Sequence, residues 1–383
     1  MKKRFTVQGW YGADNVGDEA LLDGIISQLR SRFVDADICV FSQAPDSTSV
    51  RHGVPSLWNL PTSTSGMFAA PTLWQLRRAA LPSLARLLRT DVFVAGGGGI
   101  ISDHHPGQLD GWLWRIRLAQ RLARRVVCYG VGVERILSEA AGERLRETLI
   151  RVPMISVRDE QSRSELARWG VEHNVVLSAD PAFVLTVDSN APSTLTEPGA
   201  ILICAVNRFR GDLLDRYGEL HAEALARFQA GRSQPIPVYL CQFMESEISL
   251  KTYLAGVPGF RGALPLYKES AAVVLRTLAD ASLVISTRLH GLILSLVAGV
   301  RCIPIVYSFK VQSCAQTLGI EQLGVEFGDG LAWPARKPEP ERLAAGIASA
   351  LSAPPPDRSL LDQLRARAQR QLDALEHVVS TLT

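Results

Sequence analysis

Short apolar runs rich in β-branched residues alternate, in the first half of the chain, with longer segments whose apolar positions recur at helical spacing. Short runs that are hydrophobic throughout are typical of strands buried on both faces of a parallel sheet. The runs predict strands at residues 5–8, 38–41, 92–95, 126–129 and 155–157. The segments between them predict helices at residues 18–33, 72–88, 109–124 and 139–150. Such alternation favours a doubly wound α/β domain.

The alternation stops near Asp188 and resumes at Ala200. Residues 188–199 (DSNAPSTLTEPG) are rich in Pro, Ser, Thr and Asn and have no apolar face, which is typical of an interdomain linker. Beyond them the same pattern predicts a second Rossmann-like domain. Its strands are expected at residues 201–206, 237–241, 283–286 and 302–306, and its helices at residues 213–229, 271–279 and 289–297.

Four segments follow from this pattern. We expect an N-terminal Rossmann-like domain at residues 1–190, a linker at residues 191–199 and a C-terminal Rossmann-like domain at residues 200–355. Residues 356–383 are strongly helical and are expected to form a closing helix that packs back across the hinge. Two such domains would face each other across a cleft.

Composition and charge limit the function classes. The 383 residues suit about two domains of roughly 150 residues each. A hydrophobic fraction of 47% with 21% charged residues excludes a disordered or coiled-coil chain. The net charge of +3 lacks the basic excess of a nucleic-acid-binding protein, so no nucleic-acid partner is expected. The most apolar segment, residues 289–300, is shorter than the ~18 residues of a membrane span.

Further patterns bear on location and metals. Gln8, Asp14 and Asp18 interrupt the N-terminal segment before an apolar run forms, so no cleaved export signal is expected. The six cysteines are scattered without a CxxC pair, which indicates reduced thiols in a cytoplasmic protein. Asp103, His104 and His105 could be read as metal ligands, but no partner lies at a familiar spacing, so no metal is expected.

The first motif is GWYGADNVGDEALL, residues 9–22, between a predicted strand and a predicted helix. Its glycines permit a tight turn and close approach of the backbone. The spacing is not that of a dinucleotide fingerprint, and Asp18 and Glu19 at the helix start would repel a pyrophosphate. Asp18 is therefore a candidate base or sugar-binding group, or else a residue that caps the helix.

The second motif is AGGGGIISDHH, residues 95–105. Four consecutive glycines destabilise regular structure, so we expect a loop at the end of a strand whose backbone approaches another group closely. Ligands of open parallel sheets bind at such strand ends. A tight turn packed under the other domain is the alternative.

The third motif is STRLHGLILSLVAGV, residues 286–300, where a strand leads into a helix. A helix N-terminus favours an anion, and Arg288 adds a guanidinium that can bind phosphate or carboxylate with two hydrogen bonds. His290 can exchange a proton near neutral pH, or can be a structural histidine. Lys310 follows the next predicted strand and is either a further cation of the same edge or solvated surface.

Together these motifs resemble the polysaccharide pyruvyl transferases, particularly the branch that acts on bacterial cell-wall and exopolysaccharide sugars. The resemblance covers nearly the whole chain. It includes the three motifs above and VRDEQSRSELARWGV (residues 157–171), SADPAF (178–183) and YSFKV (307–311). The family is similar in fold to the B-type glycosyltransferases, which have two Rossmann-like domains facing a cleft.

The resemblance implies transfer of the pyruvyl group of phosphoenolpyruvate to two hydroxyls of one sugar, with no cofactor, on the cytoplasmic side of the cell membrane. It implies an acceptor side in the N-terminal domain and a donor side in the C-terminal domain. His290 and Asp18 are the expected catalytic pair. The expected substrate contacts are Arg288, Lys310, Arg158, Gly97, Gly98, Asp103 and Asn15. The chain departs from the family near residues 205–208, so no role is assigned to Asn207 or Arg208.

Two other functions fit the same motifs. One is a glycosyltransferase of this architecture that uses a nucleotide sugar, and the other is a non-catalytic sugar-binding protein. The acceptor sugar, including whether it is lipid-linked, and the oligomeric state do not follow from the sequence.

Residues 112–125 (WLWRIRLAQRLARR) combine five arginines with two tryptophans at helical spacing. They could dock on an anionic membrane, but a helix with one buried stripe and one solvated charged face is the favoured interpretation.

Overall fold

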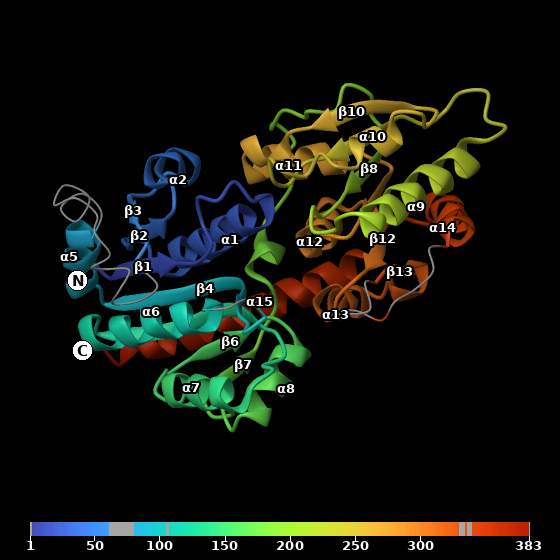
Figure 1. The fold of residues 1–383 in the computed structure, drawn as a ribbon. Helices are drawn as coiled ribbons and strands as arrows, with labels where there is room; N and C mark the ends of the chain where they lie inside the picture. Colours follow the sequence, from blue (N-terminus) through green and yellow to red (C-terminus); the bar gives the residue numbers. More distant parts are fainter. Residues whose placement is uncertain (1, 61–79, 105–106, 329–333, 335–338, 383) are drawn as a thin grey trace. The chain divides into compact units, whose positions relative to one another are not determined.

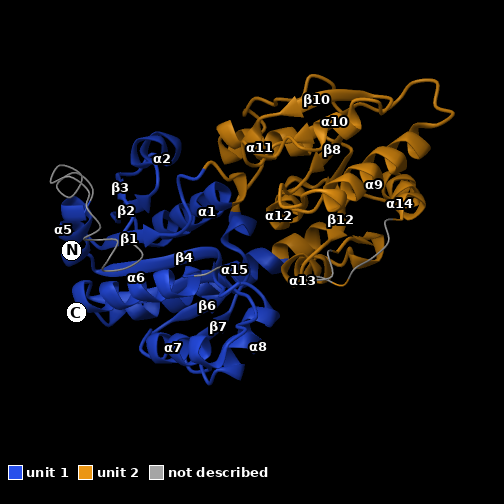
Figure 2. Ribbon diagram, viewed as in Figure 1, with its two compact units in different colours: residues 1–13, 18–184, 363–383 blue, residues 14–17, 185–362 orange. Residues whose placement is uncertain are grey.

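The computed structural model describes residues 2–60, 80–104, 107–328, 334 and 339–382. These residues form two compact units (Figure 2). Unit 1 comprises residues 1–13, 18–184 and 363–383, and unit 2 comprises residues 14–17 and 185–362. The chain therefore passes between the units more than once. Within the described ranges, no helix is both long enough and apolar enough to cross a membrane.

Unit 1 contains a parallel sheet in the order β3-β2-β1-β4-β5-β6-β7 (Figure 1). Its strands are β1 (Arg4–Gln8), β2 (Asp37–Ser42), β3 (Ser56–Trp58), β4 (Val92–Ile101), β5 (Arg125–Val133), β6 (Ile155–Val157) and β7 (Val175–Leu177). The helices that accompany it are α1 (Val16–Arg32), α2 (Pro45–His52), α5 (Leu81–Leu88), α6 (Gln108–Leu122), α7 (Glu139–Leu149), α8 (Glu160–Arg168) and α15 (Arg358–Ser380).

Helices cover both faces of this sheet. Successive strand side chains point to opposite faces, so Val94 packs with α1 and α15 while its neighbour Phe93 packs with α6. Leu372 and Leu375 of α15 are fully buried in the first of these two cores. Burial on both faces explains why the strands are hydrophobic throughout.

Unit 2 contains a second parallel sheet in the order β10-β9-β8-β11-β12-β13. Its strands are β8 (Ile201–Cys204), β9 (Val238–Cys241), β10 (Phe260–Leu264), β11 (Leu283–Ser286), β12 (Arg301–Val306) and β13 (Val325–Glu326). Its helices are α9 (Asp212–Gln229), α10 (Lys251–Leu254), α11 (Ala271–Ala279), α12 (Leu289–Ala298), α13 (Phe309–Thr317) and α14 (Pro340–Ser352). The two sheets confirm the predicted α/β class.

The strand order reverses once in each sheet. In unit 1 the chain passes from β1 outward to β3 and returns to β4 on the other side of β1. In unit 2 it passes from β8 outward to β10 and returns to β11. Ligands of open parallel sheets bind outside the carboxyl ends of the strands at such a reversal. Candidate binding residues are therefore expected beyond the carboxyl ends of the strands at each reversal, β1 and β4 in unit 1 and β8 and β11 in unit 2.

Residues 185–199 contain no regular element but are attached to unit 2. The Thr194 backbone N–H donates to Thr277 Oγ1 at 3.0 Å, and the Gly199 N–H donates to the Asp280 carbonyl at 2.7 Å. Leu195 is buried. This stretch lies along the unit that it leads into.

One predicted element lies partly outside the described residues. Residues 81–88 of the predicted helix 72–88 form α5, and residues 72–79 are not described. The six cysteines are free thiols, and all but Cys314 are buried.

Candidate functional site

The glycine run of the second motif is strand, and the prediction of a loop is wrong. β4 continues through it to Ile101, with an irregular register against β5 between Gly98 and Ile101. Gly97 and Gly98 adopt φ of 77° and 79°, which bends the strand without ending it. The expected close approach does occur, because a Cβ added at Gly97 would lie 1.7 Å from Leu21 Cδ2.

Asp18 lies beside this bend. It is in the first turn of α1, and its Oδ1 is 3.3 Å from the position that a Cβ of Gly98 would occupy. A carboxylate in the first turn is stabilised by the helix dipole. The strand bend and the start of α1 thus bring Asp18, Gly97 and Gly98 together in the second half of β4.

Asn15 forms a hydrogen bond at the start of α1. Its Oδ1 accepts a hydrogen bond from the Gly17 N–H at 3.2 Å, which satisfies a free N–H at the start of α1. Asn15 therefore caps α1. From the sequence it was expected only to contact the substrate.

A buried polar cluster holds the first motif in place. Glu19 Oε1 accepts from the Gly12 N–H at 2.8 Å, and Glu19 Oε2 lies 2.7 Å from His52 Nε2. His52 Nδ1 lies 2.6 Å from Asp23 Oδ1. Burial would lower the pKa of His52, but the hydrogen bonds to Asp23 and Glu19 outweigh it and raise that pKa to about 9. A protonated His52 thus fixes Glu19, which fixes the turn at Gly12.

Tyr11 links the first motif to the glycine run. Its hydroxyl donates to the Gly96 carbonyl at 2.6 Å. Burial raises the pKa of Tyr11 well above its ordinary value, so the phenol is a neutral donor. The first and second motifs therefore form one connected structure in unit 1.

Arg158 lies at the end of β6 and is buried. Its Nη1 is 3.3 Å from Asp180 Oδ2, and its Nε is 3.4 Å from Asp159 Oδ2. A Cβ added at Gly132 would lie 2.8 Å from the guanidinium. Two carboxylates therefore balance the charge of Arg158, which the sequence predicts as a substrate contact.

Asp103 and His104 follow β4. Asp103 Oδ2 accepts from the backbone N–H groups of Leu137 and Ser138 at 2.9 and 3.3 Å. His104 Nδ1 lies 3.3 Å from Glu134 Oε2. Over the described ranges, no group of three His, Cys, Asp or Glu side chains could hold a metal ion. His105 lies outside those ranges.

Arg288 occupies the N-cap position of α12 in unit 2. The Ser286 hydroxyl accepts from the Arg288 N–H at 3.0 Å and donates to the Arg288 carbonyl at 2.9 Å, which fixes the turn after β11. The guanidinium forms an ion pair with Glu247, whose side chain is 1% exposed. Glu247 also accepts from the N–H groups of Phe243 and Met244 at 3.0 and 3.1 Å. A buried carboxylate thus orients Arg288.

The third motif and residues 15–17, at the start of α1, meet within unit 2. A Cβ added at Gly17 would lie 2.1 Å from His290 Nδ1, so only glycine permits this approach. Asn15 Oδ1 lies 3.5 Å from Arg288 Nη1, and the Val16 N–H donates to the Phe243 carbonyl at 3.0 Å. Part of the first motif and the third motif are therefore neighbours, although about 270 residues separate them in the chain.

Lys310 lies in the first turn of α13, after β12. β12 is paired in parallel with β11, and Ser286 is opposite Pro304. Arg288 and Lys310 thus follow the carboxyl ends of adjacent strands, as predicted from the sequence.

Three residues of these clusters were missed. Glu247, His52 and Asp180 lie far in sequence from the side chains they hold. Only Asp180 lies in a segment that the sequence analysis singled out, SADPAF. The structure places the predicted residues in two groups. Asp18, Gly97, Gly98, Asp103 and Arg158 are in unit 1, and Asn15, Arg288, His290 and Lys310 are in unit 2.

The sequence profile described as polysaccharide pyruvyl transferase matches residues 15–308. That range contains every residue of both groups except Lys310. Comparison with curated protein sequences gives no significant match.

Solved structures resemble the whole chain at low identity. The UDP-GlcNAc 2-epimerase of Neisseria meningitidis, bound to UDP-GlcNAc, is 10% identical, with a TM-score of 0.59 over 100% of this chain and 99% of that chain. The UDP-GlcNAc 2-epimerase of Methanocaldococcus jannaschii is 13% identical, with a TM-score of 0.56 over 92% and 93%. A glycosyltransferase of Rickettsia africae is 11% identical, with a TM-score of 0.52 over 100% and 98%. The fold is therefore glycosyltransferase-B-like.

Proposed function

Because the chain belongs to the polysaccharide pyruvyl transferase family, we propose that it moves the pyruvyl group of phosphoenolpyruvate onto two hydroxyls of one sugar. The product is a cyclic ketal, and phosphate is released. The acceptor is a cell-wall or exopolysaccharide precursor, and the reaction takes place on the cytoplasmic side of the membrane. The observation that carries this proposal is the pre-oriented Arg288 at the N-terminus of α12, within the matched range.

The donor site of this proposal is in unit 2. Phosphoenolpyruvate carries a phosphate and a carboxylate, both of which bind guanidinium groups and free backbone N–H groups. The start of α12 offers such N–H groups, and Arg288 is fixed next to them by Glu247. Lys310 supplies a second cation at the end of the neighbouring strand. This arrangement is pre-organised, so little ordering is needed when the anion binds.

The acceptor side is in unit 1. We assign the bend at Gly97 and Gly98 to the sugar, since backbone without side chains lets a ligand approach closely. Asn15 and Asp103 remain proposed contacts for the substrates. Arg158 is charge-balanced by Asp159 and Asp180, so it would contribute N–H donors rather than net positive charge.

Formation of the ketal requires proton transfers to the donor and from both hydroxyls of the sugar. The first sugar oxygen forms a bond to C2 of phosphoenolpyruvate, and the methylene carbon gains a proton to become a methyl group. The second sugar oxygen then bonds to C2 as the bond to the phosphate oxygen breaks, and phosphate leaves with the electron pair. Each hydroxyl loses a proton. We assign removal of a hydroxyl proton to Asp18, and protonation of the donor or of the departing phosphate to His290.

The test of the His290 assignment is phosphate release from phosphoenolpyruvate in the presence of an acceptor. His290→Gln should lower turnover by about two to four orders of magnitude, the usual loss for one acid or base. Retention of wild-type turnover would show that His290 has no catalytic role. His173→Gln, an exposed histidine whose Nε2 lies 3.0 Å from the Ile150 carbonyl, is the matched control and should leave turnover unchanged.

A second candidate is a nucleotide-sugar-dependent glycosyltransferase, because proteins of similar fold include a glycosyltransferase. A ligand that binds the folded state raises its unfolding temperature. Stabilisation by phosphoenolpyruvate favours the pyruvyl transferase. Stabilisation by nucleoside diphosphates alone, without phosphate release, favours the rival, and acceptor binding without phosphate release favours a non-catalytic sugar-binding protein.

A further inference from the structure

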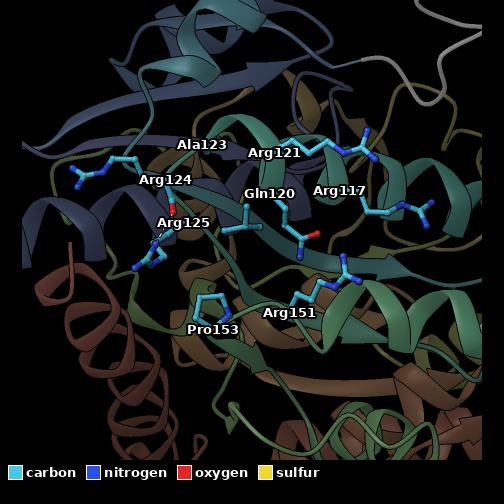
Figure 3. Close-up of a pocket in the computed structure, with 9 residues that line it drawn as sticks. Arg117, Gln120, Arg121, Ala123, Arg124, Arg125, Arg151 and Pro153 are labelled. Atoms are coloured by element: carbon cyan, nitrogen blue, oxygen red, sulfur yellow. Dashed lines mark hydrogen bonds between the residues drawn. The ribbon is translucent and has the colours of Figure 1, made fainter. Parts of the chain in front are cut away.

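A pocket lined with arginines lies in unit 1, and none of its lining residues belongs to the candidate site described above (Figure 3). It has a volume of about 480 Å³, within the range of small-molecule sites. Its lining residues are Arg117, Gln120, Arg121, Ala123, Arg124, Arg125, Val126, Arg151 and Pro153. Five of the nine are arginines and none is acidic, so the pocket has a strong positive potential.

The pocket is at the amino-terminal edge of the sheet. Arg117 and Arg121 come from the second half of α6, Arg125 begins β5, and Arg151 follows α7. The glycine bend and Arg158 lie at the opposite, carboxyl-terminal edge. β5 rises about 3.3 Å per residue over nine residues, so the two edges are roughly 25 Å apart. A small ligand in this pocket therefore cannot touch the candidate residues of unit 1.

Most of these arginines are not neutralised by the protein. Within the part of the chain that the structure describes, Arg124 is the only one of the five with a carboxylate partner, Asp91 at 3.5 Å. Its Nη2 donates to the Leu382 carbonyl at 3.3 Å. Among the described residues, Arg117, Arg121 and Arg151 have no ion pair. Several arginines elsewhere on unit 1 do form ion pairs, including Arg144 with Asp110, Arg163 with Glu160 and Arg168 with Glu165.

Helix geometry places two of the unpaired charges together. Arg117 and Arg121 are four residues apart on α6, so they share one face and repel each other. Figure 3 shows Arg117, Arg121 and Arg151 on one side of Gln120, and Arg124 and Arg125 on the other. The carboxyl end of the α6 dipole stabilises the positive charges of Arg121 and Arg124, but it does not stabilise those of Arg117 or Arg151. An external anion would compensate all of them.

The apolar side of α6 is not available for insertion into a membrane. Trp112, Leu113 and Ile116 are buried in the core of unit 1, which confirms the predicted buried stripe. What α6 exposes near the pocket is charge, gathered around a concave surface rather than spread over a flat one. This favours a compact ligand of high charge density.

We propose that this pocket binds a diphosphate group. Guanidinium groups bind phosphate oxygens with two hydrogen bonds, and a diphosphate brings several negative charges into a small volume. A soluble diphosphate or the diphosphate head of a membrane lipid could supply it. The pocket shares no residue with the proposed donor site, and its binding of a diphosphate does not depend on the proposed reaction.

The experiment is calorimetric titration of the full chain with inorganic pyrophosphate. The pocket variant is Arg121→Gln with Arg151→Gln, and the matched control is Arg163→Gln with Arg168→Gln, which removes the same charge from exposed positions of unit 1. Each charge-assisted hydrogen bond lost should weaken binding about tenfold. We expect a roughly 100-fold loss for the pocket variant and less than a twofold change for the control.

Absence of pyrophosphate binding by the wild type at millimolar concentration would overturn the proposal. An equal loss in both variants would also overturn it, because only general charge would then matter. Binding that survives in the pocket variant places pyrophosphate elsewhere, including at Arg288, and overturns the proposal too. Phosphate release from phosphoenolpyruvate at saturation should be unchanged in the pocket variant, and pyrophosphate binding can be measured even if no such reaction occurs.

Two further measurements distinguish the source of the ligand. Flotation with phosphatidylcholine vesicles that contain geranylgeranyl diphosphate tests a lipid head, and titration with uridine diphosphate tests a soluble ligand. Binding that depends on Arg121 and Arg151 in either arm supports the proposal. Binding only to vesicles of phosphatidic acid, with no affinity for pyrophosphate, would show a general anionic surface contact and contradict it.

Discussion

At the scale of single residues, the candidate side chains are held by partners that are distant in the chain. Arg288 and His290 were identifiable because a strand leading into a helix is visible in the hydrophobic pattern. Glu247 was not, since an acidic residue in an irregular stretch has no signal that pairs it with an arginine 41 positions later. The same holds for His52, whose two carboxylate partners lie about 30 residues before it. Long-range pairing is a property of the fold.

The ion pair of Arg288 and Glu247 gives the first stability prediction. Glu247→Ala leaves a largely buried guanidinium without its partner, and we expect a loss of about 2–3 kcal/mol in the free energy of unfolding. Urea unfolding measures it. Glu341→Ala, which breaks the exposed pair with Arg227, should cost less than about 1 kcal/mol. Equal losses for the two substitutions would show that the buried pair contributes no more to stability than the exposed pair does.

His52 gives a prediction about pH. Its pKa is raised from 6.5 to about 9 in the folded chain, so the folded state binds this proton more tightly than the unfolded state does. Its contribution to stability is complete below pH 6.5 and is lost as the pH rises through 9. Burial lowers the pKa of a second buried histidine, His221, to about 4, so His221 stays neutral over this window.

We therefore expect the stability difference between the wild type and His52→Gln to shrink between pH 6.5 and 9.5. Urea midpoints at four pH values measure this difference. A difference that stays constant over the range would mean that His52 is not charged in the folded chain.

At the scale of elements, the hydrophobic pattern located the longer strands and helices closely. β1, β2, β6, β8, β9, β11 and β12 were predicted within two residues of their observed bounds, whereas β4 and β5 extend beyond their predicted ends. The short edge strands β3, β7, β10 and β13 were missed, because runs of two to five partly buried residues have little pattern. The glycine run was predicted to be a loop because glycine has a low propensity for strands. In the structure, hydrogen-bonded pairing of β4 with β5 outweighs that low propensity.

The bend in β4 gives a prediction at this scale. Gly97→Ala forces a side chain into a left-handed conformation and also into Leu21. Gly53→Ala, at the end of α2, meets only the conformational cost, because no described atom lies within 4 Å of an added Cβ. We expect a loss of about 1 kcal/mol for Gly53→Ala and of roughly 2–4 kcal/mol for Gly97→Ala. Thermal unfolding measures both losses. Similar losses would show that the Leu21 side chain moves away from the new methyl group at no cost in stability.

At the scale of the whole molecule, the predicted two-fold repetition of an α/β sheet is confirmed. The paths of the chain between the units could not be read from the pattern. Residues 14–17 belong with unit 2, although the residues before and after them belong to unit 1. The C-terminal helix, by contrast, was expected to pack back across the hinge, and α15 packs on unit 1, where Gln28 Nε2 donates to the Ala368 carbonyl at 2.9 Å. Side-chain packing decides such assignments, and neither periodicity nor composition reports it.

The reaction itself is tested most directly by the product. Mass spectrometry of sugar acceptors incubated with the protein and phosphoenolpyruvate in heavy water should show a gain of one pyruvate less one water. Because the methylene carbon takes its proton from solvent, the new methyl group should carry one deuterium. Unmodified sugars with intact phosphoenolpyruvate across a broad acceptor panel, or transfer from a nucleotide sugar instead, would contradict the proposed function.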